Sequence, residues 1–490
     1  MVPDGRRIAG ETVARVRRRI DGLPLAIGRA TARPRALIDW THARCSDRER
    51  LLWARASVFA GGMDLAAAEA VCSGDGIARE DVPALIAALA DRWVLIRQET
   101  ADGARYRMPD PIRRYGRERL AELGEETRAT RRHRVHYRDL AARSAAELFG
   151  PDQVSRFARL RRERAELRAA LECCFAEPGE AATGLAMAAD LLHHWLTGHR
   201  VDEGRRWLAR GLAAWTEPDG LRARALWAAG RLAVARGEAG AAETLLDESR
   251  AIAGRLGLAA DLGDAALLAG MVAMARGRPA DAIVRYEEAL DRHRLAGEPA
   301  GVALALVRLC LTCVLLGDSP RALAHAHDCL AVCDAHGEGW HRAYATMALG
   351  IDTWRRGDPA RAAELLKEGL RVVAALDDLP GTGLALAALA WIAATQERHD
   401  RAARLLGAAT GAWRGTAMPL PEHRHLLRRH AECAAIVRHA MGIPAFQEAT
   451  RRGERLSQVA ALAYALEERR PAAGPALWRR RAGDRSGSPA

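Results

Sequence analysis

The chain has 490 residues, of which 49% are apolar and 28% charged, a composition typical of globular and not of disordered proteins. A single lysine, Lys367, stands among 74 basic residues, and its neighbours do not form the G-x-x-x-x-G-K-[ST] sequence of a phosphate-binding P-loop. The net charge is +12, but a Pro- and Gly-containing tail, residues 469–490, supplies much of it through six Arg and one Asp. The charge therefore favours an Arg-biased composition with a disordered basic tail over a nucleic-acid-binding protein.

The cysteines and the apolar runs indicate the cellular compartment of the protein. Nine cysteines are scattered along the chain, which is typical of a reduced compartment and not of a secreted disulfide framework. The N-terminus has no apolar core of the signal-peptide kind, and the longest apolar run, Leu384 to Ala394, is too short to cross a bilayer. We therefore expect a cytoplasmic protein without a membrane partner.

The segment 35–120 combines helix and hairpin signals. Ser46 and Glu49 have the spacing of a capping box at the start of a helix, and Gly61-Gly62 is expected to end that helix. Another helix is expected to run from about residue 81 to residue 93. After it, Asp102-Gly103 lies between two strand-like stretches and predicts a hairpin.

Helices followed by a hairpin predict a winged-helix domain over residues 35–120. A helical linker is expected over residues 121–196, and residues 1–34, before the winged helix, form a separate segment.

The second half of the chain repeats with a fixed period. Glycines recur every 40 residues at Gly237, Gly277, Gly317 and Gly357, and alanines keep the same step at Ala242, Ala282, Ala322, Ala362 and Ala402. Such a period predicts an α-solenoid of helix pairs over residues 197–468. The pattern of small residues resembles the tetratricopeptide repeat. Because the unit exceeds the usual repeat length, we expect extended loops.

Several motifs together resemble a known family. Gly22-Leu23-Pro24-Leu25-Ala26 is similar to the GLPLA motif of NB-ARC (STAND) signal-transduction NTPases. The stretches around Trp53, Tyr115 and Gln153 are similar to the winged-helix and linker segments of large bacterial regulators of the LuxR and AfsR type. The resemblance covers about residues 8–468. It implies that residues 1–34 are a remnant of the helical region that accompanies the NTPase. It also implies a transcriptional regulator in which the winged helix acts as a hinge on an NTPase and the repeats act as a sensor.

The chain departs from that family in ways that bear on nucleotide binding. The P-loop would lie before Met1, no helix-turn-helix pattern follows Glu468, and the Met-His-Asp position reads Met108-Pro109-Asp110. The resemblance places Gly22, Pro24 and Asp110 in a remnant nucleotide site. Without the phosphate cradle such a site has little affinity, so no cofactor is expected, and an NTPase on another chain is a candidate partner.

The remaining candidate residues are better explained as packing residues than as a metal or catalytic site. Cys310 and Cys313, with Cys329 and Cys333, have a spacing that suggests zinc, but Cys310 and Cys329 fall where the repeat requires small buried residues, so no metal is expected. No H-E-x-x-H or G-x-S-x-G motif is present, and we expect no catalytic residue and no enzyme.

The best candidate surface is the groove lined by the first helices of the repeats. The repeat register places there Trp227, Met271, Met274, Tyr344, Met347, Trp354 and Trp391. A groove rich in Met and Trp suits a protein, a peptide or a small effector, although the same residues also suit packing between units.

The sequence therefore predicts a mainly α protein that is the effector- or protein-binding part of a LuxR/AfsR-type regulator. One alternative is a regulator that binds DNA through the winged helix. In its candidate recognition helix, Glu80 to Arg92, acidic residues outnumber basic ones. The other alternative is a residual ATP-binding STAND switch.

Overall fold

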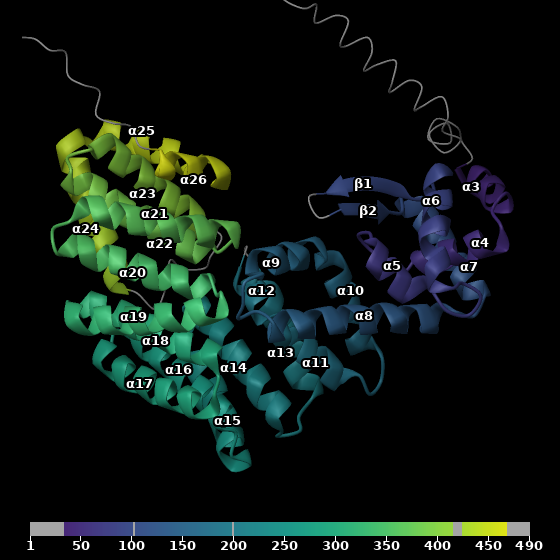
Figure 1. Ribbon diagram of the computed structural model, residues 1–490, viewed down its shortest axis with the longest axis horizontal. Coiled ribbons are helices and arrows are strands. Elements are labelled where there is room, and N and C mark those ends of the chain that lie inside the picture. Colours follow the sequence, from purple (N-terminus) through teal and green to yellow (C-terminus); the bar gives the residue numbers. More distant parts are fainter. Residues whose placement is uncertain (1–33, 101–102, 198–199, 415–423, 468–490) are drawn as a thin grey trace, which may run out of the picture. The chain divides into compact units, whose positions relative to one another are not determined.

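The protein is almost entirely helical (Figure 1). The computed structural model describes residues 34–100, 103–197, 200–414 and 424–467. The chain divides into two compact units, one of residues 1–305 with 332–339 and one of residues 306–331 with 340–490. This division falls inside the range assigned to the repeats. The mainly α prediction is confirmed, whereas the remnant before residue 34 and the basic tail lie outside the described residues.

The N-terminal region contains helices closed by a two-stranded hairpin. Its helices are α3 (Pro34–Ala43), α4 (Asp47–Ala56), α5 (Leu65–Cys72), the 3-10 turn η1 (Arg79–Asp81), α6 (Val82–Asp91) and α7 (Asp110–Glu122). Its strands are β1 (Ile96–Thr100) and β2 (Gly103–Arg107). The strands pair antiparallel, with Ile96 opposite Arg107 and Thr100 opposite Gly103. The predicted hairpin is confirmed, and helices followed by a hairpin are the arrangement expected of a winged helix.

The two ends of α4 test the helix start and the helix stop that the sequence predicts. Ser46 Oγ accepts a hydrogen bond from the Glu49 amide at 3.3 Å, and the Glu49 carboxylate accepts one from the Ser46 amide at 2.6 Å, so the capping box is confirmed. The helix stop expected at Gly61-Gly62 is wrong, because α4 already ends at Ala56. The glycine pair lies in the loop that follows, whose role is described below.

A helical stretch connects this region to the repeats. It comprises α8 (Glu126–Ala146), α9 (Gln153–Arg162), α10 (Arg164–Ala176), α11 (Ala181–Asp190), α12 (Leu192–Leu196) and α13 (Val201–Ala214). Within it α8 packs on α10 and α11, and α11 packs on α13 and α14. The side chains between these helices form one core with those of the N-terminal region.

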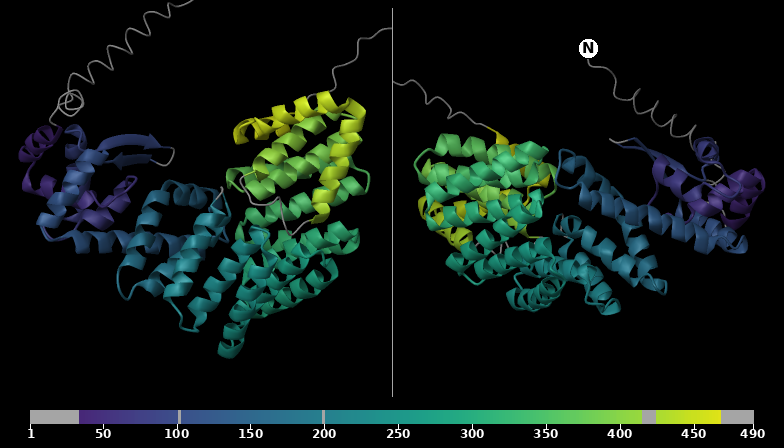
Figure 2. Two further views of the ribbon diagram at one scale, coloured as in Figure 1. Left: turned by 180° about the vertical axis from the view of Figure 1, so that it is seen from behind. Right: turned by 60° about the horizontal axis from the view of Figure 1, so that its bottom comes forward.

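The repeats follow as helices joined by short turns (Figures 1 and 2). They are α14 (Gly220–Ala235), α15 (Ala239–Leu256), α16 (Ala259–Ala275), α17 (Pro279–Ala296), α18 (Pro299–Leu316), α19 (Ser319–His336), α20 (Trp340–Arg355), α21 (Pro359–Ala375), α22 (Leu379–Thr395) and α23 (His399–Trp413). The pairs α14–α15, α16–α17, α20–α21 and α22–α23 pack closely, as in tetratricopeptide repeats. The described chain then continues through α24 (Arg424–Met441), α25 (Ile443–Glu454) and α26 (Gln458–Leu466).

The period of 40 residues consists of two halves of equal length. The turn within each pair has a left-handed residue at Gly237, Gly277, Gly317, Gly357 and Glu397, with φ between 57° and 94°. The turn between pairs has one at Gly257, Gly297, Gly337 and Asp377, with φ between 60° and 69°. The expectation of extended loops is therefore wrong. The additional residues lengthen the helices, which span 16 to 18 residues in α14 to α17.

The small residues of the repeat lie where helices approach each other. Every alanine of the series from Ala242 to Ala402 is fully buried. A Cβ atom added to Gly230 would lie 2.5 Å from a Leu268 methyl carbon, and one added to Gly270 would lie 2.3 Å from the Tyr286 ring. Larger side chains at these positions would push the two helices apart.

One of the described helices is long and apolar enough to cross a bilayer by length and composition alone. This helix is α18, and 61% of its apolar window is buried against the rest of the protein. A core helix of a water-soluble protein has the same properties, so we assign α18 to the interior of the repeats.

Candidate functional site

Most of the predicted groove residues in the first compact unit are buried between helices. Met271 and Met274 are 0% and 3% exposed. The guanidinium of Arg231, one repeat before Met271, contacts the Met271 sulfur. Trp227 is half-buried, and its indole nitrogen donates to the Asp264 carbonyl at 2.9 Å.

In the second compact unit, the predicted groove residues are likewise buried or half-buried. Met347 and Trp391 are 0% and 3% exposed, and the rings of Trp391 and the half-buried Trp354 lie 5.9 Å apart. Tyr344 is half-buried, and its hydroxyl donates to the buried Asp378 carboxylate at 2.9 Å. Four of the seven predicted residues thus fill the space between helices, as the packing alternative predicted. Whether the three half-buried ones meet a ligand stays a prediction.

The residues of the remnant nucleotide site are not brought together in the described part of the chain. Gly22 and Pro24 lie outside the described residues. Asp110 is exposed at the first turn of α7, and its carboxylate lies 3.5 Å from the Arg113 guanidinium.

The four repeat cysteines are buried. Cys310, Cys313, Cys329 and Cys333 are each 0% exposed, and burial raises the pKa of the Cys310 thiol far above its ordinary value. The Cys310 thiol therefore remains protonated, and the four buried side chains serve as small apolar residues in the packing. Among the described residues no group of three or more His, Cys, Asp or Glu side chains is placed to hold a metal ion.

A buried carboxylate joins the N-terminal region to α10, a feature that sequence reasoning missed. Glu166 is 1% exposed and accepts hydrogen bonds from the amides of Ala60 at 3.0 Å, of Gly61, and of Gly62 at 3.1 Å. His133 of α8 lies 2.8 Å from the same carboxylate. Glycine is required in this loop, because a Cβ atom on Gly61 would lie 2.8 Å from the Ala165 methyl group.

A second buried carboxylate extends the contact to the hairpin. Glu163 is 2% exposed and binds the Arg105 guanidinium of β2, which also donates to the Gly62 carbonyl at 2.8 Å. The Tyr137 hydroxyl of α8 donates to Glu163 at 3.2 Å. Burial, and then the neighbouring carboxylate charge, raise the pKa of Tyr137, so the phenol stays a donor.

We call these residues the junction: Ala60, Gly61, Gly62, Arg105, His133, Tyr137, Glu163 and Glu166. Buried carboxylates with several charge-assisted hydrogen bonds hold their partners in one geometry. The junction therefore fixes the loop after α4 and the hairpin against α8 and α10. The only sequence signal for it was the Gly61-Gly62 pair, which equally fits a helix end.

The candidate recognition helix, Glu80 to Arg92, contains α6, which offers no basic side chain on its exposed face. The residues exposed there are Pro83, Ala84, Ala87 and Asp91. The half-buried Arg92, directly after α6, is paired with Glu49 at 3.1 Å. Binding to duplex DNA relies on basic groups that neutralise phosphates. This surface does not provide them.

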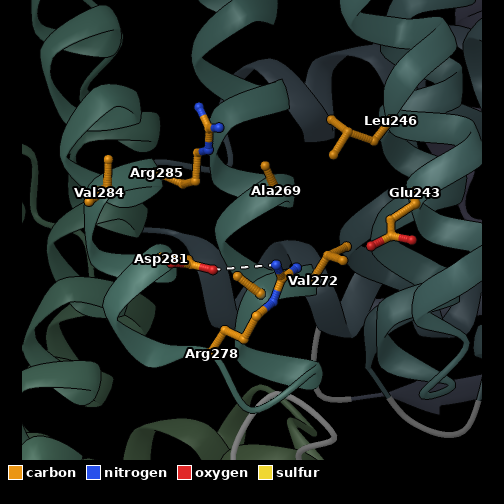
Figure 3. A pocket seen from close by; sticks show the side chains of 9 residues that line it. Glu243, Leu246, Ala269, Val272, Arg278, Asp281, Val284 and Arg285 are labelled. Atoms are coloured by element: carbon orange, nitrogen blue, oxygen red, sulfur yellow. Dashed lines mark ion pairs between the residues drawn. The ribbon is translucent and has the colours of Figure 1, made fainter.

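Clefts open between successive second helices of the repeats in the first unit. One cleft of about 300 Å³ is formed by α15, α16 and α17 (Figure 3). An equivalent cleft of about 520 Å³ lies one repeat earlier, between α13, α14 and α15. The floors of the two clefts are equivalent, since Ala229 and Ala233 of the earlier cleft lie one repeat before Ala269 and Ala273 of the later one. Alanine on these faces leaves the space, and ion pairs lie at the rim, such as that of Arg278 with Asp281 at 3.4 Å.

Comparison with known proteins adds a relationship in sequence. No model of a known protein family matches the chain. Proteins named "Putative HTH-type transcriptional regulator" from Mycobacterium tuberculosis and Mycobacterium bovis are 28% identical to it over 448 residues. The chain is a distant relative of these regulators. The match covers 81% of this chain and 50% of the regulator, so the chain spans about half the length of the curated relatives it matches.

Two solved structures share a distant likeness with the chain. A signal transduction ATPase with numerous domains from Pyrococcus horikoshii, which has a tetratricopeptide repeat sensor, matches 84% of this chain and 64% of its own, with 12% identity and a TM-score of 0.44. A Rap protein complexed with competence and sporulation factor matches 67% of this chain and 99% of its own, with 11% identity and a TM-score of 0.46. Likenesses at this level carry no information on what this chain binds.

Proposed function

We propose that the chain is a non-enzymatic regulatory protein, the effector- or protein-binding part of a LuxR/AfsR-type transcriptional regulator, and that it works in the cytoplasm. The observation that carries this proposal is the relationship to HTH-type transcriptional regulators over 81% of the chain. Because that match takes in most of the chain, it includes both the N-terminal region and the repeats. The proposed role therefore needs both parts and a connection between them.

The packing of the first unit supports such a connection. Helix α14 of the first repeat packs on α11, and α11 packs on α8 and α10. His133 and Tyr137 of α8, Glu166 of α10 and Glu163 directly before α10 belong to the junction. A ligand that shifts the first repeats would change the packing of these helices. The junction would pass that change to the hairpin and to the loop after α4, which would present it to a partner, for example an NTPase chain.

The repeats would recognise a protein, a peptide or a small effector. The clefts between second helices recur with the repeat and combine an alanine floor with charged side chains at the rim. Recurring clefts of this kind suit a ligand that contacts more than one repeat. The half-buried aromatic residues on the first helices, Trp227, Tyr344 and Trp354, are a second candidate surface.

Transcript profiling in the bacterium that encodes the chain tests the regulatory role. Deletion of the gene is expected to change a reproducible set of transcripts, and the wild-type gene supplied in trans is expected to restore them. A Glu172→Gln gene, altered at an exposed residue of α10, should restore them equally. Identical transcript profiles with and without the gene, in growing and in stationary cells, would contradict the proposal.

Direct binding assays separate the two alternative functions. A residual STAND switch predicts that ATP or ADP raises the thermal unfolding midpoint and that inorganic tripolyphosphate does not, because such a pocket recognises the base. A DNA-binding regulator predicts an affinity for duplex DNA that falls steeply with salt. The exposed face of α6 does not favour the second outcome.

A further inference from the structure

One face of α8 carries an unusual concentration of positive charge. The helix contains six arginines and two acidic residues. Arg131 and Arg132 follow Arg128 by three and four residues, and His136 follows Arg132 by four, spacings that place side chains on the same side of a helix. Together with Val135 and Asp139 of α8 and with Ala70 of α5, these four residues line a cleft of about 410 Å³. This volume lies within the range of small-molecule sites, which is about 300–1,000 Å³.

The cleft is positive after its internal ion pairs are counted. Arg128 and Arg132 both contact Asp75, and Asp139 is paired with Arg138 at 2.6 Å. Three guanidiniums, those of Arg128, Arg131 and Arg132, therefore line the cleft with one carboxylate, that of Asp139, and the Asp75 carboxylate contacts two of the three. Arg131 is exposed and forms no hydrogen bond or ion pair with another described residue.

The Asp75 carboxylate occupies the position on Arg128 and Arg132 that an anionic ligand would take. A single oxygen, Oδ2, accepts from Arg128 at 2.7 Å and from Arg132 at 3.0 Å. These guanidiniums, Arg128 foremost, lower the pKa of Asp75, so the carboxylate is ionised at neutral pH. It is about half exposed and lies in a loop where its φ is 40°. An exposed carboxylate of this kind is a replaceable ligand for the two arginines.

A phosphate group matches the cleft better than this carboxylate does. It carries up to two negative charges and three strong acceptor oxygens, whereas Asp75 offers one charge and uses one oxygen for both arginines. The additional oxygens could bind Arg131, and the His136 ring provides a nitrogen at the edge of the same cleft.

We propose that the cleft between α5 and α8 binds a phosphorylated small molecule, whose phosphate replaces the Asp75 carboxylate on Arg128 and Arg132 and also binds Arg131. This site is separate from the repeat surfaces, and it does not depend on the proposed regulatory function. The opposite face of α8 carries His133 and Tyr137 of the junction, so a bound anion would restrain the helix that holds the junction.

Isothermal titration of the full chain with sodium tripolyphosphate at constant ionic strength tests the proposal. Saturable binding at one site is expected. Arg131→Gln should weaken it about tenfold, the loss typical of one charge-assisted hydrogen bond. The matched control is Arg255→Gln, which changes another exposed arginine that has no partner among the described residues, at the end of α15, and it should bind like the wild type.

Removing the competing carboxylate provides an independent test, in which the affinity for tripolyphosphate should rise instead of fall. Asp75→Asn removes the competing charge and should tighten tripolyphosphate binding several-fold, while a thermal scan checks that the variant is folded. The proposal is overturned if tripolyphosphate does not bind, or if neither Arg131→Gln nor Asp75→Asn changes its affinity. It is also overturned if duplex DNA binds in an Arg131-dependent way and tripolyphosphate does not, because the cleft would then be part of a nucleic-acid surface.

Discussion

Two residues adopt a left-handed backbone where the repeat otherwise places glycine. Glu397 has a φ of 57° in the turn within the last pair, and Asp377 has a φ of 60° in the turn before it. A residue with a Cβ atom is strained in this conformation by about 1–2 kcal/mol. These two turns therefore reduce the stability of the second unit.

Replacing Glu397 with glycine should stabilise the second unit. The expected gain is about 1 kcal/mol, because glycine adopts the left-handed conformation without strain but loses more entropy on folding. Urea denaturation followed by circular dichroism measures the change. Gly357→Ala, in the equivalent turn one repeat earlier where φ is 94°, should lower stability by a similar amount. A destabilised Glu397→Gly variant would show that the carboxylate, and not the backbone, dominates at this turn.

A buried histidine predicts how the first unit responds to acid. His194 is 1% exposed, and burial, with nearby arginines adding to it, lowers its pKa from 6.5 to about 3. Between these two pH values the unfolded chain binds a proton that the folded chain does not. The stability that His194 supports is thus fully present above pH 6.5 and is lost as the pH falls toward 3.

The experiment compares unfolding midpoints at pH 7.5 and pH 5. His194→Leu removes the titrating ring, so this variant should lose less stability than the wild type on acidification. His439→Gln, at an exposed position in α24, should lose as much as the wild type. Equal losses in all three proteins would mean that His194 is protonated in the folded state.

At the scale of elements, the contact between α23 and α25 depends on glycine. A Cβ atom on Gly453 of α25 would lie 2.0 Å from the Arg404 carbonyl oxygen, and one on Gly407 of α23 would lie 2.1 Å from the Thr450 carbonyl oxygen. Both neighbours are backbone atoms, which cannot move without moving a helix. The two helices approach this closely only because both positions lack a side chain.

Gly453→Ala should therefore separate α23 from α25 and destabilise the second unit by about 1–3 kcal/mol, the usual range for overpacking. Thermal unfolding measures the loss. Gly240→Ala is the control, since Gly240 of α15 has no neighbour within 4 Å of its added Cβ atom, and alanine there should be neutral or mildly stabilising. A neutral result for Gly453→Ala would contradict this account of the packing.

The elements themselves were largely predictable. The 40-residue period, the small-residue positions, the capping box at Ser46 and the hairpin at Gly103 each depend on local chemistry, which a single sequence displays. The extra length of the unit was assigned to loops because sequence shows the period but not how it is divided between helix and turn. Gly257, Gly297 and Gly337, spaced like the first glycine series, were the signal that marked the second turn.

At the scale of the first unit, the junction is the connection on which the proposed function depends. Glu166→Gln removes a charge that three amides and His133 contact, and it places an amide group opposite at least one backbone N–H donor. Loss of these charge-assisted bonds should cost about 2 kcal/mol locally. Hydrogen exchange at residues 60–62 should accelerate, while exchange within the repeats should stay unchanged.

Glu172→Gln provides the comparison, since it makes the same change at an exposed position of the same helix, and it should leave exchange at residues 60–62 unaltered. In the bacterium, a folded Glu166→Gln protein that restores transcripts as well as the wild type does would contradict the proposed role of the junction. The proposal that the repeats bind a ligand would still stand.

The sequence by itself determined the helical class, the repeat and its small-residue contacts, and the distant relation to putative HTH-type transcriptional regulators, because these follow from local patterns and motifs. Tertiary structure alone decided which surfaces are open. Met271, Met347 and Trp391 have the register of a groove but are buried, since neighbouring helices close over them. The junction and the arginine-lined cleft join residues far apart in the chain, such as Gly62 with Glu166 and Asp75 with Arg132. No spacing in a single sequence reveals such pairs, because folding alone brings them together.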